Sequence, residues 1–222
     1  SRAGLNPEQA RAFTLMASAL LWSRLMSYDL SREQLAAIES MKLAQLVPKV
    51  QSDAYVEVEH SRQLLMHIAG GAGTGKSKVV QALTDFCAAW DLTGCVVKTA
   101  TTGLAATVIR GMTWHKAVGK NRKSSDIAET TLAALQRQWE PISMLVIDEV
   151  SMMSAAELHM INERLQAMTD DPHLSTRLFG GLHVVFVGDL SQLSPVKGKP
   201  IYPSIVDPSQ VSPATVRGLQ LW

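Results

Sequence analysis

The sequence predicts an α/β fold in which a parallel sheet is covered by helices on both faces. Short apolar runs of strand length alternate along the chain with longer segments that carry helical spacing or capping residues. A glycine-rich run, 70–77, lies between one such strand and the next helix, and two later strands end in carboxylates. Because parallel sheets bind ligands at the carboxyl ends of their strands, these observations also predict where a site lies.

Residues 1–60 are predicted to form a helical extension before the sheet. Asn6-Pro7-Glu8-Gln9 supplies an N-cap, a proline suited to the first turn, and a glutamine placed to complete a capping box. The helix is expected to run to about Ser27, and its apolar residues on most sides indicate burial. A second capping signal predicts a helix over 31–47, and 55–58 has the pattern of a short strand.

Residues 61–222 are predicted to form the sheet domain. Four apolar runs have strand length, at 63–69, 95–99, 144–149 and 182–189. Helical segments are expected from residue 78 and over 104–110, 126–139 and 154–168, the last opened by a capping box of Ser154 and Glu157. Five of the nine prolines lie in the last 28 residues, so a loop with little regular structure is expected there.

Composition narrows the classes of partner. A net charge of +1 gives no overall basic field, so any nucleic-acid contact has to come from a local groove. Cys87 and Cys95 lie in apolar surroundings, which predicts buried free thiols in a reducing compartment. No secretory signal is visible and no uncharged apolar run reaches membrane-spanning length, so no membrane partner is expected.

The run Gly70-Gly71-Ala72-Gly73-Thr74-Gly75-Lys76-Ser77 has the spacing of a P-loop between a strand and a helix. Glycines let backbone N–H groups line an anion site, and the following helix adds the positive end of its dipole. Lys76 is then expected to reach the β- and γ-phosphates, and Ser77 to hold Mg²⁺. The alternative is a plain glycine-rich turn without a ligand.

Asp148 and Glu149 end an apolar strand, which is the Walker-B position. In that position Asp148 is predicted to hold Mg²⁺, and Glu149 to orient or deprotonate the attacking water. Gln192, just beyond the fourth strand, can accept from water and donate to a γ-phosphate oxygen. Two solvated acids and an ordinary loop glutamine are the alternatives. The predicted cofactors are ATP and Mg²⁺.

Several segments together resemble the PIF-type superfamily-one DNA helicases, and especially their Helitron-transposon branch. The resemblance rests on the P-loop, Thr102-Gly103-Leu104-Ala105-Ala106, Gly111-Met112-Thr113-Trp114-His115, Asp148-Glu149-Val150-Ser151-Met152, Phe179-Gly180-Gly181, and Gly188-Asp189 followed by Gln192-Leu193-x-Pro195-Val196. It implies a RecA-like lobe of an ATP-driven, five-prime-to-three-prime DNA helicase. Thr101 and Ser194 stand where the family usually has proline.

The resemblance also implies roles for individual residues. Leu5-Asn6-x-Glu8-Gln9 is similar to the family's glutamine motif, so Gln9 would contact adenine, with helix capping as the alternative role. Thr102, Gly103, Thr113 and His115 lie in segments that touch single-stranded DNA in the family. The basic loop that follows, with Lys116, Lys120, Arg122 and Lys123, is expected to contact phosphates, and Trp114 to be available for stacking on bases. A solvated charge run is the alternative.

The family pattern places a second lobe, with its arginine fingers, beyond Trp222. The 222 residues are therefore expected to bind ATP and to hydrolyse it very slowly on their own. A nucleotide-responsive DNA-binding module without turnover is the rival hypothesis, and a P-loop ATPase that never meets DNA is a weaker one. The expected partners are single-stranded DNA and the second lobe, in the nucleus, or in the cytoplasm of a prokaryote.

Overall fold

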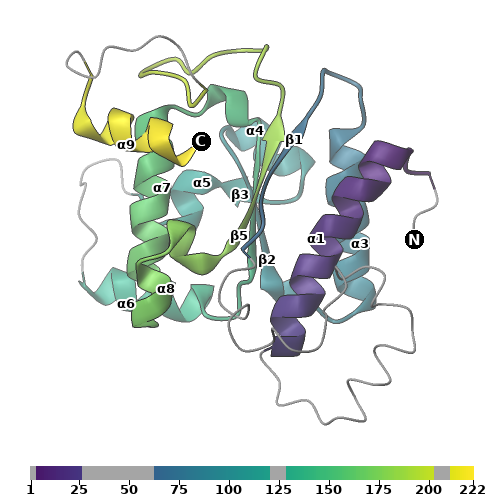
Figure 1. Cartoon of the computed structure of the whole chain (residues 1–222), viewed down its shortest axis with the longest axis horizontal. Helices are drawn as coiled ribbons and strands as arrows, with labels where there is room; N and C mark the ends of the chain where they lie inside the picture. The colour runs from purple at the N-terminus through teal and green to yellow at the C-terminus, as the bar shows by residue number, and fades with distance from the viewer. Residues whose placement is uncertain (1–3, 27–62, 121–128, 203–210) are drawn as a thin grey trace, which may run out of the picture. The chain divides into compact units, whose positions relative to one another are not determined.

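The computed structural model describes residues 4–26, 63–120, 129–202 and 211–222 (Figure 1). The predicted helix over 31–47, the short strand over 55–58 and the predicted boundary at residue 60 lie outside these ranges. The chain forms two compact units, one made of 1–64 and 77–93, the other of 65–76 and 94–222.

The first unit contains helix α1 (Pro7–Met26) and helix α3 (Lys76–Ala89), whose first residue belongs to the second unit. The predicted N-terminal capping box is confirmed. The Asn6 Oδ1 accepts from the Gln9 N–H at 2.9 Å, and the Gln9 Oε1 accepts from the Asn6 N–H at 3.0 Å. The rings of Phe13 and Phe86 meet edge to face with centroids 5.9 Å apart, which ties the two helices together.

The second unit is built on a five-stranded parallel sheet in the order β1-β5-β4-β2-β3. The strands are β1 (Leu65–Ala69), β2 (Val96–Ala100), β3 (Met112–Thr113), β4 (Met144–Asp148) and β5 (His183–Gly188). The predicted α/β class and the four predicted strands are confirmed. The two-residue β3 was not predicted, because it is too short to produce a period-two pattern.

Helices α6 (Glu129–Trp139), α7 (Ala155–Met168) and α9 (Pro213–Leu221) lie on one side of this sheet (Figure 1). Their apolar residues form one core with alternate residues of the two central strands, among them Leu145, Ile147, Val184 and Phe186. The intervening strand residues are buried as well, so both faces of the central strands are shielded from water. The capping box of Ser154 and Glu157 at the start of α7 is confirmed.

The prediction of loop over the last 28 residues is wrong for α9. Ser212 caps this helix by accepting from the Thr215 N–H at 3.2 Å, and Pro213 occupies its first turn. A proline there costs no hydrogen bond, because the first N–H groups of a helix have no partner within it. The number of prolines therefore predicted a loop at a position where a helix begins.

The expected loop after residue 111 is also partly regular. Met112 and Thr113 pair with β2, and a short helix α5 (Trp114–Ala117) follows at once. The remaining short elements are α4 (Gly103–Val108), α8 (Pro172–Ser175) and the 3₁₀ turns η2 (Thr93–Cys95), η3 (Val150–Met152) and η4 (Leu178–Gly181). Both cysteines are buried free thiols, as predicted. Within the described ranges, no helix combines the length and apolarity needed to cross a bilayer.

Candidate active site

The P-loop joins the end of β1 to the start of α3, which confirms the predicted strand–loop–helix arrangement. Its backbone requires glycine at several points: Gly70, Gly73 and Gly75 have φ angles of +154°, +76° and +87°. At Gly70 a Cβ atom would also lie 2.6 Å from the Thr74 Oγ1. The Thr74 hydroxyl donates to the Gly71 carbonyl at 2.9 Å and closes the turn. The loop is therefore a compact turn whose backbone conformation disfavours any residue other than glycine at these three positions.

The Lys76 ammonium lies folded against this loop. Its Nζ donates to the carbonyls of Gly70 at 2.6 Å and Gly71 at 3.0 Å. The same positive charge favours the ionised forms of Asp148 and Asp189. It is the smallest of the causes that act on the pKa of each carboxyl. The structure thus brings Lys76, Asp148 and Asp189 together at the carboxyl edge of the sheet. Ser77 follows in the first turn of α3 and is exposed.

Asp148 is a buried carboxylate at the end of β4, with 8% of its surface exposed. Burial raises the pKa of its carboxyl above the ordinary value, because the charged form loses hydration. The Glu149 N–H, which donates to Asp148 Oδ1 at 2.9 Å, and the Lys76 charge act in the opposite direction and are weaker. The surroundings of Asp148 therefore compensate its ionised form only in part, and a bound cation would favour that form.

Glu149 adopts a left-handed backbone conformation, with φ 54° and ψ 43°. Such a conformation costs about 1–2 kcal/mol for a residue with a side chain, so neighbouring contacts must hold it. Thr101 provides two of them: its hydroxyl donates to the Glu149 carbonyl at 3.1 Å, and its N–H donates to the Asp148 carbonyl at 3.3 Å. Sequence reasoning noted Thr101 only as a replacement for proline, and the contact spans 48 residues of chain.

Asp189 directly follows β5 and organises the turn that carries Gln192. Its Oδ1 accepts from the Ser191 N–H at 3.0 Å, and its Oδ2 accepts from the Gln192 amide at 3.1 Å. These bonds, the Ser191 backbone first, lower the pKa of the Asp189 carboxyl. Gln192 itself is exposed and held in place by Asp189. Asp189 was not assigned a role from the sequence, although its position after an apolar strand is the same signal as that of Asp148.

The predicted DNA-contacting segments meet through the pairing of β2 with β3, which places Ala100 opposite Thr113. Thr102 caps α4 through its hydroxyl, which accepts from the Ala105 N–H at 3.2 Å, and Gly103 is exposed behind it. Thr113 is the N-cap residue of α5, and its side chain makes no capping hydrogen bond. The two segments thus lie side by side, and their contact with single-stranded DNA stays a prediction.

The basic loop departs from expectation at Trp114. This ring is buried, with 2% of its surface exposed, and so it is not available to stack on bases. His115 stacks on it with centroids 3.7 Å apart, and the Lys120 Nζ lies 5.1 Å from the ring centroid. Lys116 is exposed. Arg122 and Lys123 lie outside the described residues.

The sequence also predicted an adenine contact by Gln9 and a Mg²⁺ site. Gln9 makes the capping box of α1, so its capping role is confirmed and its contact with adenine stays a prediction. No group of three or more His, Cys, Asp or Glu side chains forms a metal centre among the described residues. The predicted Mg²⁺ ligands, the Ser77 hydroxyl and the Asp148 carboxylate, are hard oxygens of the kind that Mg²⁺ prefers. Ser77 belongs to the first unit and Asp148 to the second, so their joint site stays a prediction.

Comparison with known proteins identifies the family. A family model described as PIF1-like helicase matches residues 44–215. The chain belongs to the PIF1-like helicase family. It is 33% identical over 135 residues to an ATP-dependent DNA helicase Pif1 from Psychrobacter sp., covering 58% of this chain and 19% of that protein. It is 35% identical over 138 residues to the ATP-dependent DNA helicase RRM3 of Saccharomyces cerevisiae, covering 59% and 18%.

A solved structure agrees with this assignment. The Pif1 helicase from Candida albicans matches with a TM-score of 0.50 and 26% identity, over 77% of this PIF1-like chain and 34% of that protein. This PIF1-like chain thus spans about a fifth of the curated relatives and about a third of the solved helicase. The RecA-like lobe that the resemblance implied is confirmed, and the Helitron branch stays a prediction.

Proposed function

We propose that this chain is the ATP-binding motor lobe of a DNA helicase that moves five-prime to three-prime along single-stranded DNA and separates duplex. The observation that carries the proposal is the gathering of Lys76, Asp148, Glu149 and Asp189 at one sheet edge in a PIF1-like chain. The curated relatives, named ATP-dependent DNA helicases, support it. Under this proposal the protein acts in DNA repair and recombination, in the nucleus or in the cytoplasm of a prokaryote.

In this proposal the loop backbone from Gly71 to Gly75 cradles the phosphates of ATP. Lys76 leaves the carbonyls of Gly70 and Gly71, which it contacts in the structure, and moves to the β- and γ-phosphates. Ser77 and Asp148 would hold Mg²⁺, which would neutralise charge on the phosphate oxygens. Its positive charge also favours the ionised form of the buried Asp148.

Glu149 orients the attacking water and accepts its proton, and the strained backbone held by Thr101 sets the direction of its side chain. Gln192, positioned by Asp189, contacts the γ-phosphate, and Gln9 contacts adenine. The Asp189–Gln192 hydrogen bond at 3.1 Å links the γ-phosphate contact to the end of β5.

Single-stranded DNA is proposed to bind over Thr102, Gly103, Thr113 and His115, with Lys116 and Lys120 on its phosphates. The pairing of β2 with β3 supports this arrangement, because it places these segments side by side next to the catalytic edge. A second lobe is proposed as the partner that closes over ATP. An arginine from that lobe is worth on the order of 10³–10⁵ in rate.

Calorimetry with ATP and Mg²⁺ tests the nucleotide site. Lys76→Ala is expected to weaken binding at least about tenfold, because a charge-assisted bond to phosphate is lost. Lys78→Ala, which removes an exposed lysine two residues later in α3, is the matched control and should leave affinity unchanged. Equal affinities of the wild-type and Lys76→Ala proteins would contradict the assignment.

Steady-state ATP hydrolysis tests the motor role. The 222-residue chain is expected to turn over very slowly, and a longer natural chain carrying the second lobe is expected to be strongly stimulated by single-stranded DNA. In that longer chain Glu149→Gln should retain ATP binding and lose turnover, since this carboxylate acts on water. Binding of ATP and DNA without turnover in the longer chain would favour the nucleotide-responsive module instead. Turnover indifferent to DNA would remove the helicase assignment.

A further inference from the structure

A hollow lies at the opposite edge of the sheet from the predicted ATP site. It has a volume of about 270 Å³. Ile142 and Leu182, which line it, precede β4 and β5, whereas Asp148 and Asp189 stand at the far ends of these strands. Strands of five or six residues separate the two edges by about 15 Å. The hollow therefore belongs to neither the nucleotide site nor the predicted DNA surface.

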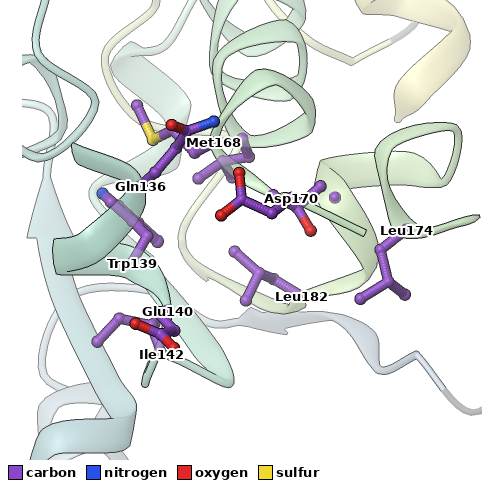
Figure 2. A pocket seen from close by; sticks show the side chains of 11 residues that line it. Gln136, Trp139, Glu140, Ile142, Met168, Asp170, Leu174 and Leu182 are labelled. Atoms are coloured by element: carbon purple, nitrogen blue, oxygen red, sulfur yellow. The ribbon is translucent and has the colours of Figure 1, made fainter. Parts of the chain in front are cut away.

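The lining combines apolar side chains with two carboxylates (Figure 2). Apolar side chains come from the ends of α6 and α7, from α8, and from the segments before β4 and β5: Trp139, Ile142, Leu165, Met168, Leu174 and Leu182. Glu140 and Asp170 add carboxylates, both on exposed residues, and Figure 2 shows that of Asp170 turned toward the middle of the hollow. Within the described residues neither carboxylate has a hydrogen-bond or ion-pair partner.

The electrostatics of the hollow favour a cation. Helix α6 ends at Trp139 and helix α7 ends at Met168, so the negative ends of two helix dipoles converge on it. No lysine, arginine or histidine is among the lining residues. Two carboxylates and two helix carboxyl ends repel phosphate, which excludes a nucleotide or a nucleic-acid strand as occupant.

The walls are fixed by polar contacts between elements. The Gln136 amide of α6 donates to the Ala167 carbonyl of α7 at 3.3 Å. The Gln166 amide donates to the Arg177 carbonyl at 2.9 Å, and the Phe179 N–H donates to Asn162 Oδ1 at 2.7 Å. The hollow is thus preformed, so little ordering free energy opposes binding.

We propose that this hollow docks an arginine-bearing apolar segment of a partner protein. A planar guanidinium pairs with a carboxylate through two parallel hydrogen bonds, and it loses less hydration than an ammonium on burial. The Asp170 carboxylate, which points into the hollow, binds the guanidinium, Glu140 adds negative charge to the lining, and the apolar lining residues bind a neighbouring aliphatic or aromatic side chain. The volume, near the lower end for ligand pockets, suits one or two side chains. The proposal is independent of the helicase assignment.

Titration by NMR or calorimetry with the tripeptides Ac-Leu-Arg-Leu-NH₂ and Ac-Phe-Arg-Phe-NH₂ tests the proposal. Binding should weaken about tenfold in Asp170→Asn, which keeps the shape and removes one charge, and should fall as salt is raised. Glu163→Gln is the matched control: it removes an exposed carboxylate of α7 that does not line the hollow, and binding should stay within about twofold. Citrulline in place of arginine should abolish most of the binding, because it keeps the shape and lacks the charge.

Three outcomes overturn the proposal. Failure of both peptides to bind would mean that the hollow is only a packing defect. Equal binding of the arginine and citrulline peptides, or an unchanged affinity in Asp170→Asn, would remove the charge recognition. Arginine amide alone binding as tightly as the tripeptides would identify a pocket for small cations instead of a docking site for protein.

Discussion

Gly218 of α9 lies against the backbone of Ala155 at the start of α7. A Cβ atom added at Gly218 would lie 1.7 Å from the Ala155 carbonyl oxygen and 2.4 Å from its carbonyl carbon. An ordinary carbon–oxygen contact is about 3.3 Å, so α9 would have to retreat by roughly 1.5 Å. Gly218→Ala is therefore expected to destabilise the chain, although alanine is normally the better helix former.

The magnitude follows from two opposing effects. Alanine in place of glycine in a helix interior gains about 1 kcal/mol. Overpacking against a rigid partner costs about 1–3 kcal/mol, and the upper end applies here because both contacting atoms are backbone. Retreat of α9 also disturbs Trp222, whose ring centroid lies 5.2 Å from those of both His67 and Phe186. The net loss is about 2 kcal/mol, or roughly 4–8 °C in Tm for a chain of this length.

Thermal unfolding followed by circular dichroism measures the effect. Gly103→Ala is the matched control, since Gly103 is also helical and a Cβ there would meet nothing within 4 Å. Its Tm is expected to equal or exceed that of the wild type. A Gly218→Ala protein as stable as the wild type would refute the reasoning, because α9 would then not be packed against Ala155 as described.

Two further predictions concern the candidate site. Asp148→Asn should stabilise the chain without Mg²⁺ near neutral pH, because burial penalises the ionised carboxyl and raises its pKa. The protonated acid carries no such penalty, so the difference in Tm between the two proteins should vanish at a pH below the ordinary carboxyl pKa and grow as pH rises through the raised value. A constant difference across pH would argue against this cause. Reversing Lys116 and Lys120 to Glu should weaken single-strand binding at low salt and lower the salt slope by about 0.7 for each lost phosphate contact, measured by fluorescence anisotropy. Arg137→Glu, an exposed reversal on α6, is the control for net charge, and it should be compared with each single lysine reversal; equal effects of Arg137→Glu and of Lys116→Glu or Lys120→Glu would mean that only net charge matters.

Local chemistry along the chain was sufficient to predict the elements around the site. The P-loop, the strand that ends at Asp148, and the capping boxes at Asn6 and Ser154 each depend on residues a few positions apart. Backbone preference and local hydrogen bonds decide such features, so they are visible in the sequence before any tertiary contact forms. The family resemblance rested on the same local segments.

Only the tertiary structure decided which of these segments meet. The strand order places β5 between β1 and β4, and this brings Asp189 beside the P-loop lysine. The burial of Trp114, the bond from Thr101 to Glu149, and the fit of Gly218 against Ala155 join residues from different elements or depend on the core around them. Burial and close approach depend on the partner surface as much as on the residue itself, so the sequence near each position carries no sign of them. The acidic hollow between α6 and α7 arises in the same way, because two helix ends 29 residues apart converge only when the core packs.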